Sequence, residues 1–278
     1  MVPCPDCRRR IDIDSRSLAH RLTQLLAGDG RSEAERAQLV RLMTLLAELG
    51  PPPDPDGDFP DYGHLRDRFR AACNAGDGDL LEEYFLELYC HLHMHAAPCT
   101  PAERKVVDAS GGTWCHAGGL SPLLKAAPFI HDLTVSVDLG AGNGLQGLLL
   151  QRLYPHRRTV QIEISSRMVE IGQRLQAWLE VPPERVKWVV ANVAEVSIAG
   201  FDFIYLYRPL RPEGPGRAFY QRMAHHLEVA RRPVVIFSIA DCLHEFLSAR
   251  FERFYHDGQL SCFRGPLSIG GRVPAATD

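Results

Sequence analysis

The sequence predicts an α/β protein: a doubly wound, mostly parallel seven-stranded sheet with an antiparallel C-terminal hairpin, preceded by a helical N-terminal domain. From residue 133 onward, strand-like and helix-like segments alternate, as they do when right-handed helical crossovers join parallel strands, and the last of these helices is expected over 242–249. Near the end, segments 251–255 and 260–263 flank Asp257-Gly258, a hairpin signal that predicts the antiparallel closure. The first hundred residues instead carry leucines at helical spacing.

The N-terminal part reads as a series of helices. Leucines at helical spacing predict a helix over 15–27, and Ser32 with Glu35 forms a capping-box pattern that starts a second helix, ending before Gly50. Residues 51–62 are rich in Pro, Asp and Gly and predict an exposed linker before helices at 63–75 and 79–97. Thr100-Pro101 predicts the cap and first turn of another helix. We expect residues 1–110 to form the helical domain and 111–278 the sheet domain.

The bulk composition restricts the function. The chain has 278 residues and a formal net charge of −3, so no global field attracts nucleic acid or an anionic membrane. It contains no apolar run long enough to span a bilayer and no secretory pattern at its start, which predicts a cytoplasmic protein. The eight cysteines are then expected to be buried thiols or metal ligands rather than disulfides.

A glycine-rich segment follows the first predicted strand. It runs Asp138-Leu139-Gly140-Ala141-Gly142-Asn143-Gly144 and leads into a predicted helix, whose free amide groups would face the same ligand. An acidic residue, Glu163, ends the next predicted strand, where a carboxylate can accept hydrogen bonds from ribose hydroxyls. This combination predicts a nucleoside-containing cofactor.

A nicotinamide dinucleotide is the second interpretation. Counted from Gly140, the last position of Gly-x-Gly-x-x-Gly is Leu145, which disfavours close helix–strand packing over a pyrophosphate. Counted from Gly142, the pattern matches formally and ends at Gly147, but this frame begins well past the strand end.

The fuller pattern, Asp-x-Gly-x-Gly-x-Gly, resembles the first motif of class I (Rossmann-like) S-adenosylmethionine-dependent methyltransferases, and the resemblance covers roughly residues 133–265. It implies that the loop glycines pack against the methionine part of the cofactor and that Glu163 holds the ribose. The predicted hairpin matches the family's antiparallel last strand. Where these enzymes often carry an acid for the adenine amino group, this chain has Asn192, followed by Val193, and we expect both residues at the cofactor site.

Three residues are candidates for work on a substrate. Tyr207 and Arg208 end the fourth predicted strand, and ligands of open α/β sheets bind beyond such ends. The segment Tyr207-Arg208-Pro209 lacks the motif of the family's base- and amide-directed members. His116, in a Gly-rich segment before the first strand, is a candidate general base. Each residue also has an interpretation without a functional role: Tyr207 could pack under the loop, Arg208 could be solvated, and His116 could bind backbone in a tight turn.

Cys4-Pro5-Asp6-Cys7 resembles one knuckle of a zinc ribbon, although no second Cys-x-x-Cys exists. Cys4 and Cys7 are therefore candidate ligands of a structural zinc ion, with unligated thiols as the alternative. Cys73, Cys242 and Cys262 are expected in the core.

The sequence as a whole predicts a methyltransferase that uses S-adenosylmethionine and acts on a small molecule or a peptide side chain. Methylation of RNA or protein is the alternative within enzymes, and the net charge argues against extensive phosphate contact. A non-catalytic module that binds the cofactor or zinc is the alternative outside enzymes.

Overall fold

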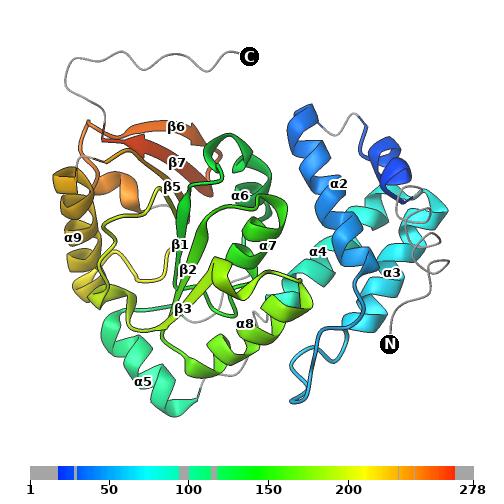
Figure 1. The fold of residues 1–278 in the computed structure, drawn as a ribbon, viewed down its shortest axis with the longest axis horizontal. Helices are drawn as coiled ribbons and strands as arrows, with labels where there is room; N and C mark the ends of the chain where they lie inside the picture. The colour runs from blue at the N-terminus through cyan, green and yellow to red at the C-terminus, as the bar shows by residue number, and fades with distance from the viewer. Residues whose placement is uncertain are drawn as a thin grey trace. The chain divides into compact units, whose positions relative to one another are not determined.

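The computed structural model describes residues 18–27, 30–93, 100–113, 118–230, 232–240 and 242–266, and the chain divides into two compact units (Figure 1). One unit comprises Met1–Ala97 with Cys115–Ala127, and the other comprises Pro98–Trp114 with Pro128–Asp278. This division differs from the one expected at residue 110. The helix α5 (Pro101–Ser110) belongs with the sheet, whereas α6 (Leu120–Lys125) returns to the helical unit, where Lys125 pairs with Glu35 at 2.5 Å.

The helical unit contains helical residues 18–25, α2 (Glu33–Glu48), α3 (Tyr62–Ala75), α4 (Gly78–Leu92) and α6. The predicted capping box at Ser32 is confirmed: its hydroxyl accepts from Glu35 N, and the Glu35 carboxylate accepts from Ser32 N. Apolar side chains at helical spacing form the core of this unit, among them Leu22, Leu42, Leu46, Tyr62, Phe69 and Phe85.

The second unit contains one seven-stranded sheet with the order β3-β2-β1-β4-β5-β7-β6. The first five strands in this order are parallel, and β7 runs antiparallel to both of its neighbours, β5 and β6. The predicted fold class, including the antiparallel hairpin, is thereby confirmed. The strands are β1 (Val135–Leu139), β2 (Arg158–Glu163), β3 (Val186–Val190), β4 (Phe203–Tyr207), β5 (Val234–Ile239), β6 (Glu252–His256) and β7 (Leu260–Gly265).

Helices cover both faces of the sheet (Figure 1). On one face α9 (Gly214–Ala230) contributes Phe219 and Met223 to a core with Val137 of β1 and Ile204 of β4. The other face carries α7 (Leu145–Leu153) and α8 (Ser166–Trp178). Because side chains alternate along a strand and neighbouring strands are in register, this second face also receives several polar and aromatic side chains. These are Asp138, Gln161, Glu163, Trp188, Tyr205 and Tyr207.

Short 3₁₀ turns η2 (Pro183–Arg185), η3 (Val193–Glu195) and η4 (Leu243–Glu245) lie in the sheet unit, and η1 (Ala127–Phe129) lies at the boundary of the two units in the chain. The helix expected over 242–249 is wrong, because only the turn η4 forms there among the described residues. Leu243 is fully buried, and the half-buried Phe246 stacks on Tyr220 of α9 with ring centroids 5.5 Å apart, so one turn suffices to place both apolar side chains against the core.

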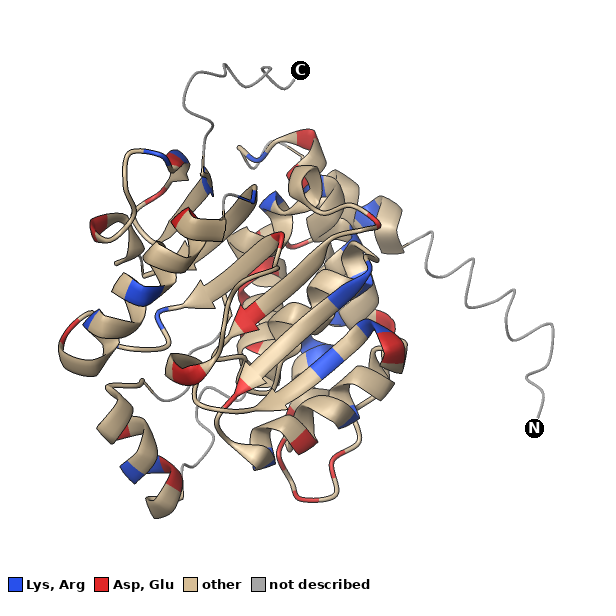
Figure 2. Ribbon diagram, turned by 60° about the vertical axis from the view of Figure 1, so that its left-hand side comes forward, with Lys and Arg blue, Asp and Glu red and all other residues tan. Residues whose placement is uncertain are grey.

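Charged residues of both signs are spread over the described part of the chain. Figure 2 shows basic and acidic residues mixed along the helices and strands, in keeping with the net charge of −3. None of the described helices is long and apolar enough to cross a membrane.

The packing of α8 on the sheet can be tested at Gly172. An added Cβ there would lie 2.2 Å from Trp188 Cη2 and 2.6 Å from Asn143 O. Gly172→Ala should therefore lower the free energy of unfolding by about 1–3 kcal/mol, although alanine is the better helix former. Urea unfolding measures this. Gly63→Ala, a helical glycine with nothing within 4 Å, is the matched control and should be neutral or slightly stabilising; equal losses in both variants would contradict the packing.

Candidate functional site

The glycine-rich loop turns sharply between β1 and α7. Gly140, Gly142 and Gly144 have φ values of 78°, 57° and 69°, in the left-handed region that favours glycine. Backbone N–H groups of Gly140 and Ala141 donate to Ile162 O at 3.0 and 2.9 Å. The loop is thereby fixed against the end of β2. The strand, loop and helix that the sequence predicted here are β1, this loop and α7.

The three glycines differ in what their missing side chains make room for. A Cβ at Gly140 would lie 2.9 Å from Pro209 Cβ, and one at Gly144 would lie 2.2 Å from Trp188 Cη2. A Cβ at Gly142 would meet only Met168 Cε, at 3.8 Å. Gly140 and Gly144 are therefore required by packing within the protein, a role that the motif alone did not reveal. At Gly142 a Cβ would meet no protein atom closer than 3.8 Å, so packing within the protein does not require this loop glycine.

Glu163 lies directly beside Gly142. Its Oε2 accepts from Gly142 N at 2.7 Å, and its Oε1 accepts from Ile164 N and Ser165 N at 2.8 and 3.0 Å. The residue is 8% exposed, and burial raises the pKa of its carboxyl while the three hydrogen bonds oppose the rise. A carboxylate has about four acceptor positions, so roughly one remains for a ribose hydroxyl where two hydrogen bonds were expected.

Asp138 is the second buried carboxyl at the loop and is 3% exposed. Burial, followed by repulsion from Glu163, raises the pKa of Asp138 to about 8, and a hydrogen bond from the Gly147 backbone opposes this. Its Oδ2 has no hydrogen-bond partner. Asp138 and Glu163 together make the base of the loop a region of negative potential whenever both are ionised.

The other predicted cofactor residues make bonds of their own. Asn143 is 2% exposed and its Oδ1 accepts from Leu145 N at 3.2 Å, within the turn into α7. Asn192 follows β3, where its Oδ1 accepts from Ala194 N at 3.0 Å and caps η3, and Val193 beside it is buried. Ala191 N donates to Glu163 O at 2.9 Å, so the end of β3 lies beside the candidate acid.

Sequence reasoning missed one apolar side chain at this edge. Val190 pairs in register with Glu163, shares its face of the sheet and is 55% exposed. An exposed valine at the end of a strand would have been a usable signal only with the pairing of β2 and β3 already known.

The candidate substrate residues lie at the end of β4, which pairs with β1. Tyr207 and Arg208 are half-buried, and Arg208 has a φ of 33°, a strained value for a residue other than glycine. Thr113, which precedes β1 in the chain, is hydrogen-bonded to the residues that follow β4. Its N–H donates to Pro209 O at 3.1 Å, and its Oγ1 donates to Arg208 O at 3.0 Å. His116 lies outside the described residues.

The predicted zinc ligands Cys4 and Cys7 also lie outside the described residues. Within the described part of the chain, no group of three or more His, Cys, Asp and Glu residues could hold a metal ion. Cys73, Cys242 and Cys262 are buried, as expected.

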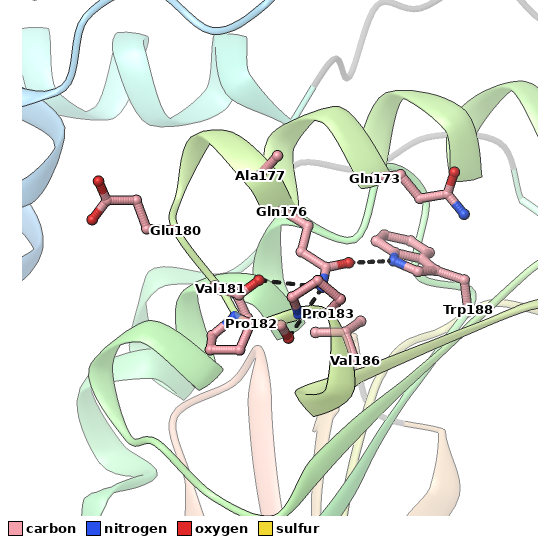
Figure 3. Close-up of a pocket in the computed structure, with 9 residues that line it drawn as sticks. All are labelled: Gln173, Gln176, Ala177, Glu180, Val181, Pro182, Pro183, Val186 and Trp188. Carbon is pink, nitrogen blue, oxygen red and sulfur yellow. Dashed lines mark hydrogen bonds between the residues drawn. The ribbon is translucent and has the colours of Figure 1, made fainter. Parts of the chain in front are cut away.

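A cavity of about 630 Å³ opens elsewhere, between α8, η2 and the edge strand β3 (Figure 3). Trp188 forms part of its wall, and its Nε1 donates to Gln176 Oε1 at 2.8 Å. The opposite edge of the same indole packs on Gly144. The other lining residues are Gln173, Ala177, Glu180, Val181, Pro182, Pro183 and Val186, none of which was a predicted site residue.

The strand order decides the fold. From β1 the chain adds β2 and β3 on one side of the sheet and then β4 and β5 on the other, so the order of the strands switches between β1 and β4, where the glycine loop lies. Strand β7 is the antiparallel strand expected from the family resemblance. The fold is Rossmann-like. This is the fold of class I methyltransferases.

Comparison with known proteins adds likenesses of fold. No protein-family model matches the chain, and no curated protein matches it. Among solved structures it is similar to an RNA methyltransferase from Salinibacter ruber in complex with S-adenosyl-L-homocysteine, at 20% identity and a TM-score of 0.39 over 66% of this chain and 99% of that one. It is also similar to the O-methyltransferase of a trans-AT PKS multienzyme from Brevibacillus brevis, in complex with the same compound. Here the identity is 18% and the TM-score 0.33, over 38% of this chain and 35% of that one. A third similar structure is a dimethyladenosine transferase from Plasmodium falciparum, at 16% identity and a TM-score of 0.34 over 43% of this chain and 40% of that one.

The raised pKa of Asp138 predicts a pH-dependent stability. A carboxyl whose pKa is raised from the ordinary 3.8 to about 8 in the folded state stabilises the fold fully below pH 3.8 and loses this contribution as the pH rises through 8. Asp138→Asn cannot ionise, so its free energy of unfolding should not fall over this pH range. At pH 9 it should exceed that of the parent by on the order of a few kcal/mol, because each pKa unit is worth about 1.4 kcal/mol. Urea unfolding at pH 5 and pH 9 measures this. The exposed Asp132→Asn variant is the control, and an Asp138→Asn gain that is equal at both pH values would contradict the assignment.

Proposed function

We propose that this protein is an S-adenosylmethionine-dependent methyltransferase whose cofactor binds beside Gly142 and Glu163. The observation that carries the proposal is the pair itself: a loop glycine that packing within the protein does not require, hydrogen-bonded at 2.7 Å to a buried carboxylate, at the switch point of a Rossmann-like sheet. Ligands of such sheets bind at this place.

The residues present fit this cofactor. Glu163 retains about one acceptor position for a ribose hydroxyl, and the exposed Val190 beside it offers an apolar surface to a purine. The carboxylate of Glu163 favours a ligand that carries positive charge, which S-adenosylmethionine does at its sulfonium and ammonium groups, and Asp138 adds to this attraction when it too is ionised, above its raised pKa of about 8. When bound, the cofactor supplies an electrophilic methyl group.

The chain's own contribution to methyl transfer is orientation and exclusion of water. Tyr207 ends the strand next to β1 and shares the face of Asp138, so we place the acceptor over Tyr207 and Arg208. An acceptor held in line at short range needs little covalent help, because positioning and desolvation supply much of the rate. We propose a small-molecule acceptor, since the mixed charges of the described surface favour no extended polyanion.

A nicotinamide dinucleotide is the second candidate ligand, because of one packing contact. A Cβ at Gly147 would lie 2.5 Å from Gln161 Nε2, so this glycine allows the close helix–strand approach that the third glycine of the dinucleotide pattern provides. Against it, the frame from Gly142 begins three residues after β1 ends at Leu139. Calorimetric titration with NAD and NADH beside S-adenosylmethionine distinguishes the two.

Cofactor binding can be tested at the loop. In Gly142→Val the side chain would occupy the space left for the ligand, and S-adenosylmethionine binding measured by calorimetry should be lost. Glu163→Ala should weaken it by tenfold or more, as expected for a charge-assisted hydrogen bond. Gly57→Ala is the matched control, because Gly57 also has a positive φ, 73°, with nothing within 4 Å, and lies in the helical unit. Unchanged affinity in a folded Gly142→Val protein would refute the site.

The acceptor side predicts a separate kinetic effect. If Tyr207 orients the acceptor, Tyr207→Phe should reduce methyl transfer at least tenfold and leave the dissociation constant of S-adenosylmethionine within about twofold. Transfer of a labelled methyl group to small-molecule, RNA and protein pools gives both the acceptor class and the rate. Labelling of the RNA pool alone would replace the small-molecule proposal, and an unchanged rate in Tyr207→Phe would return the residue to a structural role.

A further inference from the structure

Helix α5 is attached at its start to the candidate cofactor acid through one serine. Ser165 Oγ donates to Glu103 Oε1 in the first turn of α5, and Ser165 N donates to Glu163 Oε1 at 3.0 Å. The carboxyls of Glu103 and Glu163 are close enough that Glu103 contributes to the raised pKa of Glu163. The start of α5 therefore lies at the end of β2.

The other end of α5 is attached at the end of β4. Gly112 forms an isolated antiparallel bridge with Leu210, Arg211 N donates to Gly111 O at 2.8 Å, and Thr113 N donates to Pro209 O at 3.1 Å. Strands β2 and β4 flank β1, whose end carries the glycine loop. A ten-residue helix is about 15 Å long, and two strand spacings are about 10 Å, so α5 spans the loop's edge of the sheet. In Figure 1, α5 lies at the lower end of the sheet unit.

Between these attachments α5 is held weakly. Among its ten residues only Val107 is buried. The bond to Ser165 is charge-assisted: burial alone would raise the pKa of Glu103, but the hydrogen bonds from Ser165 and Thr100 and the charge of Arg167 lower it. An element with few buried contacts and strong bonds at its ends is expected to open locally when one of these bonds breaks.

We propose that Glu103 is a positioning residue that latches α5 across the cofactor site, so that the Ser165–Glu103 bond must break before the cofactor can leave. This rests on the proposed function for the identity of the ligand. The latch itself is a property of the ligand-free chain: α5 opens at one end, while its other end stays bonded to the segment after β4.

Two glycine substitutions at helix N-caps provide a matched test. Ser165→Gly removes the hydroxyl that donates to Glu103, and Thr100→Gly removes the α5 cap but keeps the latch. Glycine is tolerated at an N-cap at a cost of only a few tenths of a kcal/mol relative to serine or threonine. Ser165→Gly should raise the dissociation rate of S-adenosylmethionine, measured by stopped flow, about tenfold, the worth of one such hydrogen bond. Glu103→Ala should do the same, and Thr100→Gly should stay within about twofold.

Amide hydrogen exchange of the ligand-free protein tests the latch without the cofactor. Residues 101–110 should exchange about tenfold faster in Ser165→Gly than in the parent, while the strand 135–139 stays unchanged. Equal effects of Ser165→Gly and Thr100→Gly on α5, or an unchanged cofactor dissociation rate in Ser165→Gly, would overturn the latch. Failure of the parent protein itself to bind S-adenosylmethionine would instead overturn the proposed function.

Discussion

The buried carboxylate of Glu163 is the group on which the candidate site depends. It accepts hydrogen bonds from the backbone of Gly142, Ile164 and Ser165, which belong to the loop after β1 and to the start of α8. A buried carboxylate needs such donors because its charge has lost water. The same hydrogen bonds therefore stabilise the charge, fix the loop against β2 and orient the serine that holds α5. Substitution at this one position should disturb the loop, α8 and α5 together.

The second constraint is the close approach of α7 and α8 to the polar face of the sheet. Trp188 packs on Gly144 and Gly172, and Gln161 packs on Gly147, at distances that leave no room for a Cβ. The glycines of the motif thus have two functions, to turn the chain and to admit neighbouring side chains. The indole of Trp188 also forms part of the wall of the cavity in Figure 3, so the cavity and the glycine loop share one side chain.

Local patterns predicted the elements well where the signal itself is local. The capping box at Ser32, the helix cap at Thr100, the strand–loop–helix at residues 135–153 and the Asp257-Gly258 hairpin all depend on residues within a few positions of one another. The helix expected over 242–249 is absent, because Phe246 stacks on Tyr220, a residue more than twenty positions away. The membership of α5 in the sheet unit was likewise not foreseen, since its bonds reach residues such as Ser165 and Leu210.

The sequence by itself determined the alternation of strands and helices, the glycine loop and the acid that follows it, because hydrophobic periodicity and backbone conformation are properties of short segments. Tertiary structure decided which loop glycines are required by packing, how many acceptor positions of Glu163 the backbone already fills, and that Val190 and α5 lie at the same edge. These depend on pairing between strands and on packing between distant residues, which no single segment encodes.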